Sequence, residues 1–359
     1  MNDPRIEQYA KLLVETCVDV QPGWQVLVGG SALARPLLEE VSRAVARRGA
    51  YAMLRVNLSG SGINVPWALE APVELLEQPP EIDAYMWKHA DALVSIEAPE
   101  NTRELTGLPV ERLTTIQAGL RPHLERVLSM DLKWVGCQYP TPALAQEAEM
   151  SLAAFTDFLY GACLLDWDVE RERMKRYAER FEAAEEVRIV TDDTDVRLSI
   201  AGRPMEVDAG GANMPGGEFF TSPVEDSAEG EIVFGEFPAV YAGREVRGIR
   251  LRFEGGKVVD ASAEANEEFL LEQLDLDEGA RFLGELGIGC NPGIQRYMKN
   301  VAFDEKIDGT IHLAVGNSYS FTGGTNESAI HWDIVKDLRT DGCIYADGRL
   351  VQRDGRWEV

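Results

Sequence analysis

Two histidines in the C-terminal half of the chain lie where their side chains could take part in metal chemistry. His331 and Asp333 are two residues apart in NESAIHWD, and on a β-strand such residues project from the same face. His312 lies in a second strand-like run, residues 310–315, and could join the same site. A His-x-Asp pair also occurs as an ordinary hydrogen-bonded pair, so its spacing alone does not establish a metal site.

Two glutamates could complete such a site. Glu218 follows Pro-Gly-Gly and precedes Phe-Phe-Thr, and Glu285 lies between glycines in FLGELGIG. An unpaired carboxylate is costly to bury in an apolar segment, and a bound cation would compensate its charge. The alternative is that each glutamate is simply exposed in a loop, and composition alone favours neither interpretation.

These five side chains form an oxygen- and nitrogen-rich set without thiolates, which suits Zn²⁺, Co²⁺ or Mn²⁺. Three protein ligands are usual at a single catalytic zinc. Five therefore fit two divalent metal ions that share a bridging carboxylate and a bridging water. Coordination lowers the pKa of that water and gives a hydroxide nucleophile near neutral pH. The expected reaction is hydrolysis of an amide bond.

The N-terminal half alternates between helical and strand patterns. Strands are expected at residues 25–28, 51–57, 92–96 and 134–138, with helices at 4–18, 33–48, 81–89 and 111–128. This alternation predicts a parallel sheet built from β-α-β units. The turn VLVGGSALA after the first strand lacks both G-x-G-x-x-G and a Gly-Lys-Ser/Thr ending, so an ordinary turn is favoured over a phosphate loop.

The sequence pattern changes in the second half of the chain. Two long helices are expected at residues 142–165 and 168–185. Beyond them, short alternating runs separated by turn residues such as Gly255-Gly256 predict antiparallel hairpins. The predicted fold is an α/β domain with a mostly parallel sheet at residues 1–185, followed by an α+β, largely antiparallel metal-binding domain at 186–359.

Charge and composition exclude several classes of partner. The 359 residues include 35 Lys and Arg and 61 Asp and Glu, a net charge of −26 that repels phosphate backbones and anionic lipids. We therefore expect no nucleic acid and no membrane as partner. The N-terminal residues do not resemble a signal peptide, and no apolar run is long enough for a transmembrane helix. Five scattered cysteines, without a Cys-x-x-Cys pair, indicate a reducing cytoplasm.

Four segments resemble the signature blocks of the aminopeptidase T family of thermophilic-type metallopeptidases, which includes staphylococcal leucyl aminopeptidase. The blocks are GGEFFTSPVEDSAEG, FLGELGIG, FDEKIDGTIHLAVGNSY and NESAIHWD, and their order and rough spacing match. The resemblance extends to KWVGCQYPTPALA in the first half, although its most specific part spans about residues 213–333. It implies an N-terminal α/β domain and a C-terminal domain that holds two metals.

Carried onto this chain, the resemblance implies metal ligands at Glu218, Glu285, His312, His331 and Asp333. It also implies a catalytic tyrosine at Tyr319, seven residues after His312, that could hydrogen-bond the developing oxyanion. Family members are usually homodimers, and they release N-terminal residues, with a broad preference for apolar ones, from peptides with a free N-terminus. The resemblance thus predicts a homodimeric metallo-aminopeptidase.

Two departures from the family pattern bear on function. Family aminopeptidases carry adjacent glutamates before a Val-Phe-Thr run, whereas the first of that pair is Gly217 here. If the missing carboxylate acts as a general base or binds the substrate amine, Glu225 and Glu327 are candidate replacements. The interval from His312 to His331 is also shorter, which would shorten a loop near the metals and alter the pocket or the dimer contact.

Two other functions remain open. Ring-opening dihydroxypyridine dioxygenases look similar to this family and bind one Fe²⁺ through two histidines and one carboxylate, which His312, His331 and Asp333 could supply. Retention of Glu218 and Glu285 argues against this alternative, because a single iron would not need them. The third interpretation is non-enzymatic: the acidic residues only form a solvated surface, and the α/β half binds a partner.

Overall fold

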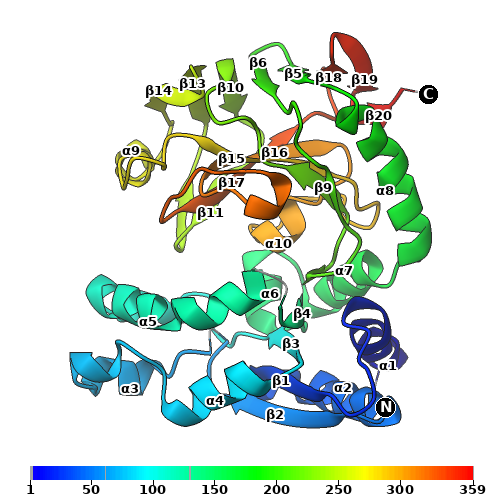
Figure 1. The fold of residues 1–359 in the computed structure, drawn as a ribbon, viewed down its shortest axis with the longest axis vertical. Coiled ribbons are helices and arrows are strands. Elements are labelled where there is room, and N and C mark those ends of the chain that lie inside the picture. The colour runs from blue at the N-terminus through cyan, green and yellow to red at the C-terminus, as the bar shows by residue number, and fades with distance from the viewer. Residues whose placement is uncertain (1–2, 61, 129–130, 359) are drawn as a thin grey trace. The chain divides into compact units, whose positions relative to one another are not determined.

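The computed structural model describes residues 3–60, 62–128 and 131–358, and the chain forms two compact units (Figure 1). The first comprises Met1–Leu164 with Gly210–Pro215, and the second comprises Leu165–Ala209 with Gly216–Val359. The sequence placed the boundary after residue 185, whereas this division begins the second unit at Leu165. Helix α8 (Trp167–Glu182) therefore belongs to the second unit by its contacts.

The first unit contains a five-stranded parallel sheet with the order β2-β1-β3-β4-β8. Its strands are β1 (Gln25–Ser31), β2 (Tyr51–Asn57), β3 (Ala92–Glu97), β4 (Lys133–Gln138) and β8 (Asn213–Met214). The centre of the sheet is buried because β1 and β3 carry runs of apolar residues, as is usual where helices cover both faces. The predicted parallel sheet is confirmed.

Helices connect these strands. They are α1 (Pro4–Lys11), the π-helical η1 (Leu12–Cys17), η2 (Ala32–Ala34), α2 (Arg35–Arg47), α3 (Val65–Glu70), η3 (Val73–Leu75), α4 (Glu81–His89), η4 (Glu104–Gly107), α5 (Val110–Leu128), α6 (Pro142–Glu147) and α7 (Leu152–Cys163). The single helix predicted at 142–165 is wrong. Ser151 accepts a hydrogen bond from the amide of Ala154 and starts α7 as a new helix.

Among the described residues, no helix is both long and apolar enough to cross a membrane.

The second unit begins with α8, whose first turn is capped by Asp166, and continues into an eight-stranded antiparallel sheet. The order is β14-β13-β10-β6-β5-β18-β19-β20. The strands are β5 (Glu186–Val190), β6 (Asp195–Ser199), β10 (Glu229–Phe234), β13 (Ile249–Glu254), β14 (Lys257–Ser262), β18 (Cys343–Ala346), β19 (Arg349–Arg353) and β20 (Arg356–Trp357). The turn at Gly255-Gly256 joins β13 to β14, as predicted.

A second antiparallel sheet in this unit carries the candidate site. Its order is β17-β16-β15-β9-β7, formed by β7 (Glu206–Asp208), β9 (Glu218–Thr221), β15 (Leu283–Gly289), β16 (Thr310–Gly316) and β17 (His331–Asp337). Every residue of β15 and β16 is buried, so polar side chains on these strands lie inside the unit. The remaining elements are β11 (Ala239–Tyr241), β12 (Arg244–Val246), α9 (Glu267–Leu274), α10 (Val301–Asp304) and η5 (Ser320–Thr322).

Candidate metal centre

The structure brings the five residues selected from the sequence together on one face of the β17-β16-β15-β9-β7 sheet. Glu285, Ala314 and Asp333 lie opposite one another across β15, β16 and β17, so their side chains share a face. His331 is two residues before Asp333 on β17 and projects from that same face, as its spacing predicts. Glu218 joins from β9, where it pairs with Gly289.

Glycine on β15 makes room for an imidazole. Gly287 pairs with His312, and a Cβ added at Gly287 would lie 2.0 Å from Cε1 and Nε2 of that ring. The ring of His312 therefore lies directly over the glycine, where any larger residue would displace it. This close approach gives a physical reason for the glycine two residues after Glu285 in the sequence.

Glu285 lies between the two imidazoles. Its Oε1 is 3.2 Å from Nε2 of His312, and its Oε2 is 3.1 Å from Nε2 of His331. Glu218 Oε2 lies 3.6 Å from Nε2 of His312, and Asp333 Oδ1 lies 3.5 Å from Nε2 of His331. Each oxygen of Glu285 thus faces a different histidine, which is the arrangement expected of a carboxylate that bridges two neighbouring ligand sets.

Backbone hydrogen bonds orient both imidazoles toward the carboxylates. The Nδ1 atom of His312 donates to the carbonyl oxygen of Glu305 at 3.1 Å, and Nδ1 of His331 donates to the carbonyl oxygen of Asn317 at 2.7 Å. With Nδ1 protonated, the neutral ring presents the Nε2 lone pair to the cluster. A carbonyl that fixes the tautomer in this way is the usual support of a metal-binding histidine.

The structure adds two residues that sequence reasoning missed. The carboxylate of Glu305 forms a group with Glu218 and His312, which we call the Glu218 group. Lys306 is fully buried, lies 3.0 Å from Glu218 Oε1 and also pairs with Glu305. The signal for Glu305 was present in FDEKIDGTIHLAVGNSY, seven residues before His312, but nothing in the sequence shows that the adjacent lysine is buried.

The other residues form a second set of ligating atoms, which we call the Glu285 group: Glu285, His331 and Asp333. Within each group the ligand atoms all lie within 4.8 Å of one another. Oε2 of Glu218 and Oδ1 of Asp333 are buried and make no hydrogen bond. Burying a carboxylate oxygen that makes no hydrogen bond costs free energy, and a bound cation would offset that cost. The residues present therefore fit divalent metal ions.

The pKa values of the cluster reflect its dense charge. Burial raises the pKa of the Glu218 carboxyl to about 8. Burial alone would lower the pKa of His312, but Glu285, followed by Glu218 and Asp333, raises it to about 10. Burial also opposes ionisation of Asp333, yet the charge of His331 holds its pKa well below the usual range. In the absence of a metal ion, protons on the imidazoles therefore supply positive charge that the carboxylates require.

Tyr319 lies beside the Glu285 group, as the resemblance implied. Its hydroxyl is 3.3 Å from Nε2 of His331, and its ring packs against Phe220 and Phe321, with centroids 5.7 and 5.2 Å away. Burial, and then the negative charges of Glu285 and neighbouring carboxylates, raise the pKa of Tyr319 above its ordinary value. The phenol therefore keeps its proton and is able to donate a hydrogen bond.

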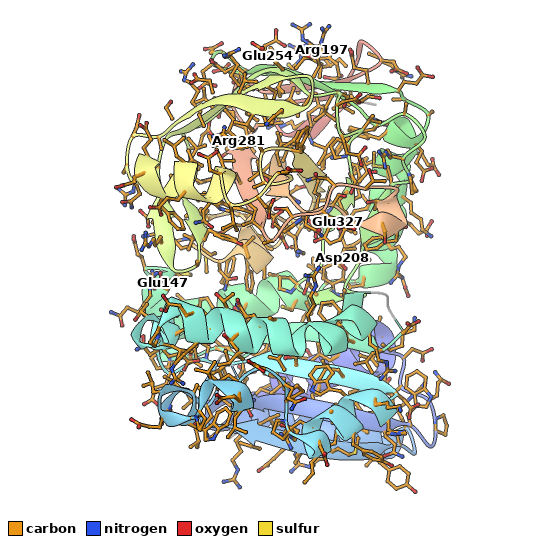
Figure 2. All side chains as sticks on the ribbon, turned by 60° about the vertical axis from the view of Figure 1, so that its left-hand side comes forward. Glu147, Arg197, Asp208, Glu254, Arg281 and Glu327 are labelled. Atoms are coloured by element: carbon orange, nitrogen blue, oxygen red, sulfur yellow. The ribbon has the colours of Figure 1, made fainter. Side chains whose placement is uncertain are left out.

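The candidate replacements for the carboxylate missing at Gly217 do not lie in the cluster. Glu225 binds Arg203 at 2.7 Å and the amide and hydroxyl of Thr325 at 2.7 and 2.8 Å, which is a structural role. Glu327, labelled in Figure 2, has an exposed side chain by its accessible surface. Gly217 has φ +116°, and a Cβ there would lie 2.6 Å from Cβ of Asn291, so this backbone excludes a glutamate. The additional carboxylate that does reach the cluster is Glu305.

Similar proteins are found over nearly the whole chain. Aminopeptidase AmpS of Bacillus subtilis is 27% identical, with 98% of each chain covered. Aminopeptidase T of Thermus thermophilus is 26% identical, with 99% of this chain and 98% of the relative covered. The solved structure of wild-type AmpT from Thermus thermophilus has a TM-score of 0.85 at 24% identity, with 99% of each chain covered, so the two share a fold.

A second solved structure has a lower similarity. The 2,5-dihydroxypyridine dioxygenase from Pseudomonas putida KT2440 has a TM-score of 0.63 at 16% identity, with 100% of this chain and 98% of that chain covered, which again indicates a common fold. The family described as thermophilic metalloprotease (M29) matches residues 2–357. The resemblance seen in the sequence is thereby confirmed: this chain is a metal-dependent hydrolase of peptide bonds and belongs to the thermophilic metalloprotease (M29) family.

Proposed function

We propose that this protein is a metal-dependent aminopeptidase that removes N-terminal residues from peptides with a free N-terminus. Relatives that match nearly the full chain carry the name aminopeptidase. The observation that carries the proposal is the buried cluster of two imidazoles and several carboxylates, in which Glu218 and Asp333 each retain an oxygen without a hydrogen bond. Such a site has little reason to exist without a cation.

The metal ligands in this proposal are Glu218, Glu285, His312, His331 and Asp333. In this proposal one divalent ion would bind at the Glu218 group and another at the Glu285 group, and the position of Glu285 between the two histidines supports this arrangement. Imidazole and carboxylate ligands without thiolate suit zinc, cobalt or manganese. When bound, such ions polarise the peptide carbonyl and lower the pKa of a coordinated water.

The protein's own groups act on the charge that develops at the scissile carbonyl. Tyr319 retains its proton and would donate a hydrogen bond to the developing oxyanion, which is a large source of transition-state stabilisation. Its position is held by ring contacts with Phe220 and Phe321. Because Gly217 has no side chain, the proposal assigns to Glu305, which pairs with Lys306, the role of accepting a proton or binding the substrate amine.

Aromatic side chains beside the cluster support a preference for apolar N-terminal residues. Phe220, Tyr319 and Phe321 pack against one another, and Phe321 remains 49% exposed. An apolar side chain of the substrate could cover the exposed ring of Phe321 and remove both surfaces from water. A charged side chain would gain no comparable contact there.

A homodimer in the cytoplasm is part of the same proposal. Leu54, Val56 and Leu58 alternate along edge strand β2 and its end, and they are 49%, 56% and 95% exposed. An exposed apolar row on one face of an edge strand is a surface that another subunit could cover. The scattered cysteines, which show no disulfide spacing, support a reducing compartment.

The dioxygenase remains the second candidate, on the basis of its shared fold and of the His312, His331 and Asp333 set. A single iron held by these three residues would leave Glu285 as a buried carboxylate whose two histidine partners are taken by the iron, whereas Glu218 would keep its ion pair with Lys306. That cost disfavours a one-iron site and favours the peptidase.

Metal analysis of protein purified without chelator, combined with two activity assays, separates these candidates. We expect zinc, cobalt or manganese, and hydrolysis of aminoacyl-anilides. Bound iron together with oxygen uptake in the presence of 2,5-dihydroxypyridine, and no hydrolysis across a broad anilide panel, would support the dioxygenase instead.

A further inference from the structure

A buried lysine distinguishes one half of the cluster from the other. The ammonium of Lys306, whose side chain is 0% exposed, is 3.0 Å from Glu218 Oε1 and also pairs with the carboxylate of Glu305. Both partners belong to the Glu218 group. In the described part of the chain, the ion pairs of Glu285 and Asp333 are formed with the two histidines. Among the described residues, the ammonium of Lys306 thus forms direct ion pairs with the carboxylates of only one of the two ligand groups.

We propose that Lys306 makes the two metal subsites unequal, because its ammonium supplies at the Glu218 group the positive charge that a second ion would otherwise supply. One divalent ion then binds tightly at the Glu285 group, and a second binds only weakly at the Glu218 group. This inference rests on the proposed metal-dependent function and concerns how many ions the resting protein holds.

The charge balance supports this inequality. With its histidine neutral, the Glu285 group carries two carboxylate charges, which match one divalent cation. With both of its carboxylates ionised, the Glu218 group also carries two, but Lys306 offsets one of them. An ion entering there would meet a smaller attraction and the repulsion of a nearby ammonium, in a buried site where charges are poorly screened.

Moving the ammonium of Lys306 away would not remove the free-energy cost of binding a second ion at the Glu218 group. The backbone of Lys306 is held on both sides: its amide donates to the carbonyl of Phe303, and its carbonyl accepts from the amide of Asn291. A displaced ammonium would remain buried without its carboxylate partners, which is strongly unfavourable. Glu218 Oε2 stays without a hydrogen bond, so the group keeps some affinity for an ion rather than none.

The test compares metal binding by the wild type and by the Lys306→Met and Lys306→Gln variants of the full chain, using isothermal titration with Zn²⁺ and metal analysis after dialysis. We expect the wild type to retain close to one equivalent and to bind a second roughly 100-fold more weakly. Both variants should retain close to two equivalents. Circular dichroism would establish that each variant is folded.

The matched control is Lys336→Gln. Lys336 is also buried (1% exposed) and also pairs with two carboxylates, Asp193 at 3.1 Å and Glu236 at 2.7 Å, but it contributes to neither ligand group. This variant should retain one equivalent. Retention of two would show that loss of a buried lysine changes metal content without acting at the cluster, and would overturn the proposal.

If the Lys306 variants do not fold, a second pair of variants tests whether the two groups differ in metal affinity. Asp333→Asn should abolish the tight equivalent, whereas Glu218→Gln should keep it. Two tight equivalents in the wild type, or loss of the tight equivalent in Glu218→Gln alone, would overturn the unequal subsites while leaving the metallopeptidase function intact. Failure of the wild type to bind any of zinc, cobalt or manganese would instead reject the proposed function, and this inference with it.

Discussion

At the scale of single residues, the site depends on neighbours that the sequence reveals only in part. The pairing of His331 with Asp333 on one face could be predicted, because their i, i+2 spacing fixes it on any strand. The flanking glycines of Glu285 left a buried carboxylate and an exposed one equally open, and the structure shows that it is buried. The burial of Glu305 and Lys306 could not be predicted, because an adjacent Glu and Lys are ordinarily exposed and only the tertiary fold encloses them.

Gly287→Ala tests whether the glycine beneath the imidazole is required. The new Cβ would lie 2.0 Å from the ring of His312, so the ring must move out of its position. We expect zinc affinity and kcat/KM each to fall by at least about 10-fold, the scale of a disturbed ligand orientation. Gly235→Ala, where an added Cβ meets nothing within 4 Å, is the control. Unchanged zinc affinity in Gly287→Ala would show that His312 does not need this space.

Tyr319→Phe removes the hydroxyl donor and keeps the ring that packs against Phe220 and Phe321. We expect kcat to fall roughly 100-fold, as when one oxyanion donor is lost, with KM and metal content nearly unchanged. Tyr51→Phe, at a residue 67% exposed on β2, should have no effect. Steady-state kinetics on an aminoacyl-anilide shows whether the substitution changes kcat, KM or both. A wild-type kcat in Tyr319→Phe would exclude the donor role.

At the scale of elements, the positions of the strands could be predicted from runs of apolar residues, whereas the break between two helices could not. The parallel strands β1 to β4 lie close to their predicted ranges because each contains a short run of apolar residues, although edge strand β2 is largely exposed. The break between α6 and α7 was missed because the helical pattern continues through it. The backbone at Glu149 turns to φ +57°, and Ser151 then caps a new helix.

A carboxylate contributes to holding the segment that precedes β17. Asp277 accepts a hydrogen bond from the backbone amide of Ala329 at 2.7 Å and another from the hydroxyl of Ser328 at 2.8 Å. Burial opposes ionisation, but these donors hold the pKa of Asp277 below its usual value. A depressed pKa in the folded state contributes stability above the unfolded pKa, near 4, and that stability is lost as pH falls through the folded pKa.

Asp277→Asn should therefore lower the melting temperature at pH 7, and the difference from the wild type should shrink as the pH falls below about 4. Thermal denaturation at several pH values measures both effects. The neighbouring exposed Glu278→Gln should change the melting temperature little at any pH. A difference between Asp277→Asn and the wild type that is the same at pH 7 and pH 3 would contradict the role of the ionised carboxylate.

At the scale of the whole molecule, the two-region architecture could be predicted from the change from α/β alternation to hairpin runs, and the fold is shared with AmpT. The residue at which the second unit begins could not be predicted in the same way. The sequence pattern of α8 indicates a helix in either unit, and only its contacts assign it to the second. The net charge of −26 indicated which partners to exclude, but it did not locate the site, since most acidic residues lie outside it.

Assembly is also tested at this scale. Val56→Glu would place a charge within the exposed apolar row of β2. If that row forms the proposed dimer contact, size-exclusion chromatography with light scattering should report a dimer for the wild type and a monomer for the variant. Val259→Glu, at a residue 42% exposed on β14, is the control and should remain dimeric. A dimeric Val56→Glu would place the contact elsewhere.

The central claim is that metal ions in the carboxylate and histidine cluster support cleavage of the first residue of a peptide. Its most direct test is hydrolysis of a short peptide with an apolar N-terminal residue, before and after metal removal, alongside the same peptide with an acetylated N-terminus. We expect release of the first residue from the free peptide only, loss of activity on chelation, and recovery on addition of zinc, cobalt or manganese. Activity that survives complete metal removal, or equal cleavage of the acetylated peptide, would contradict it.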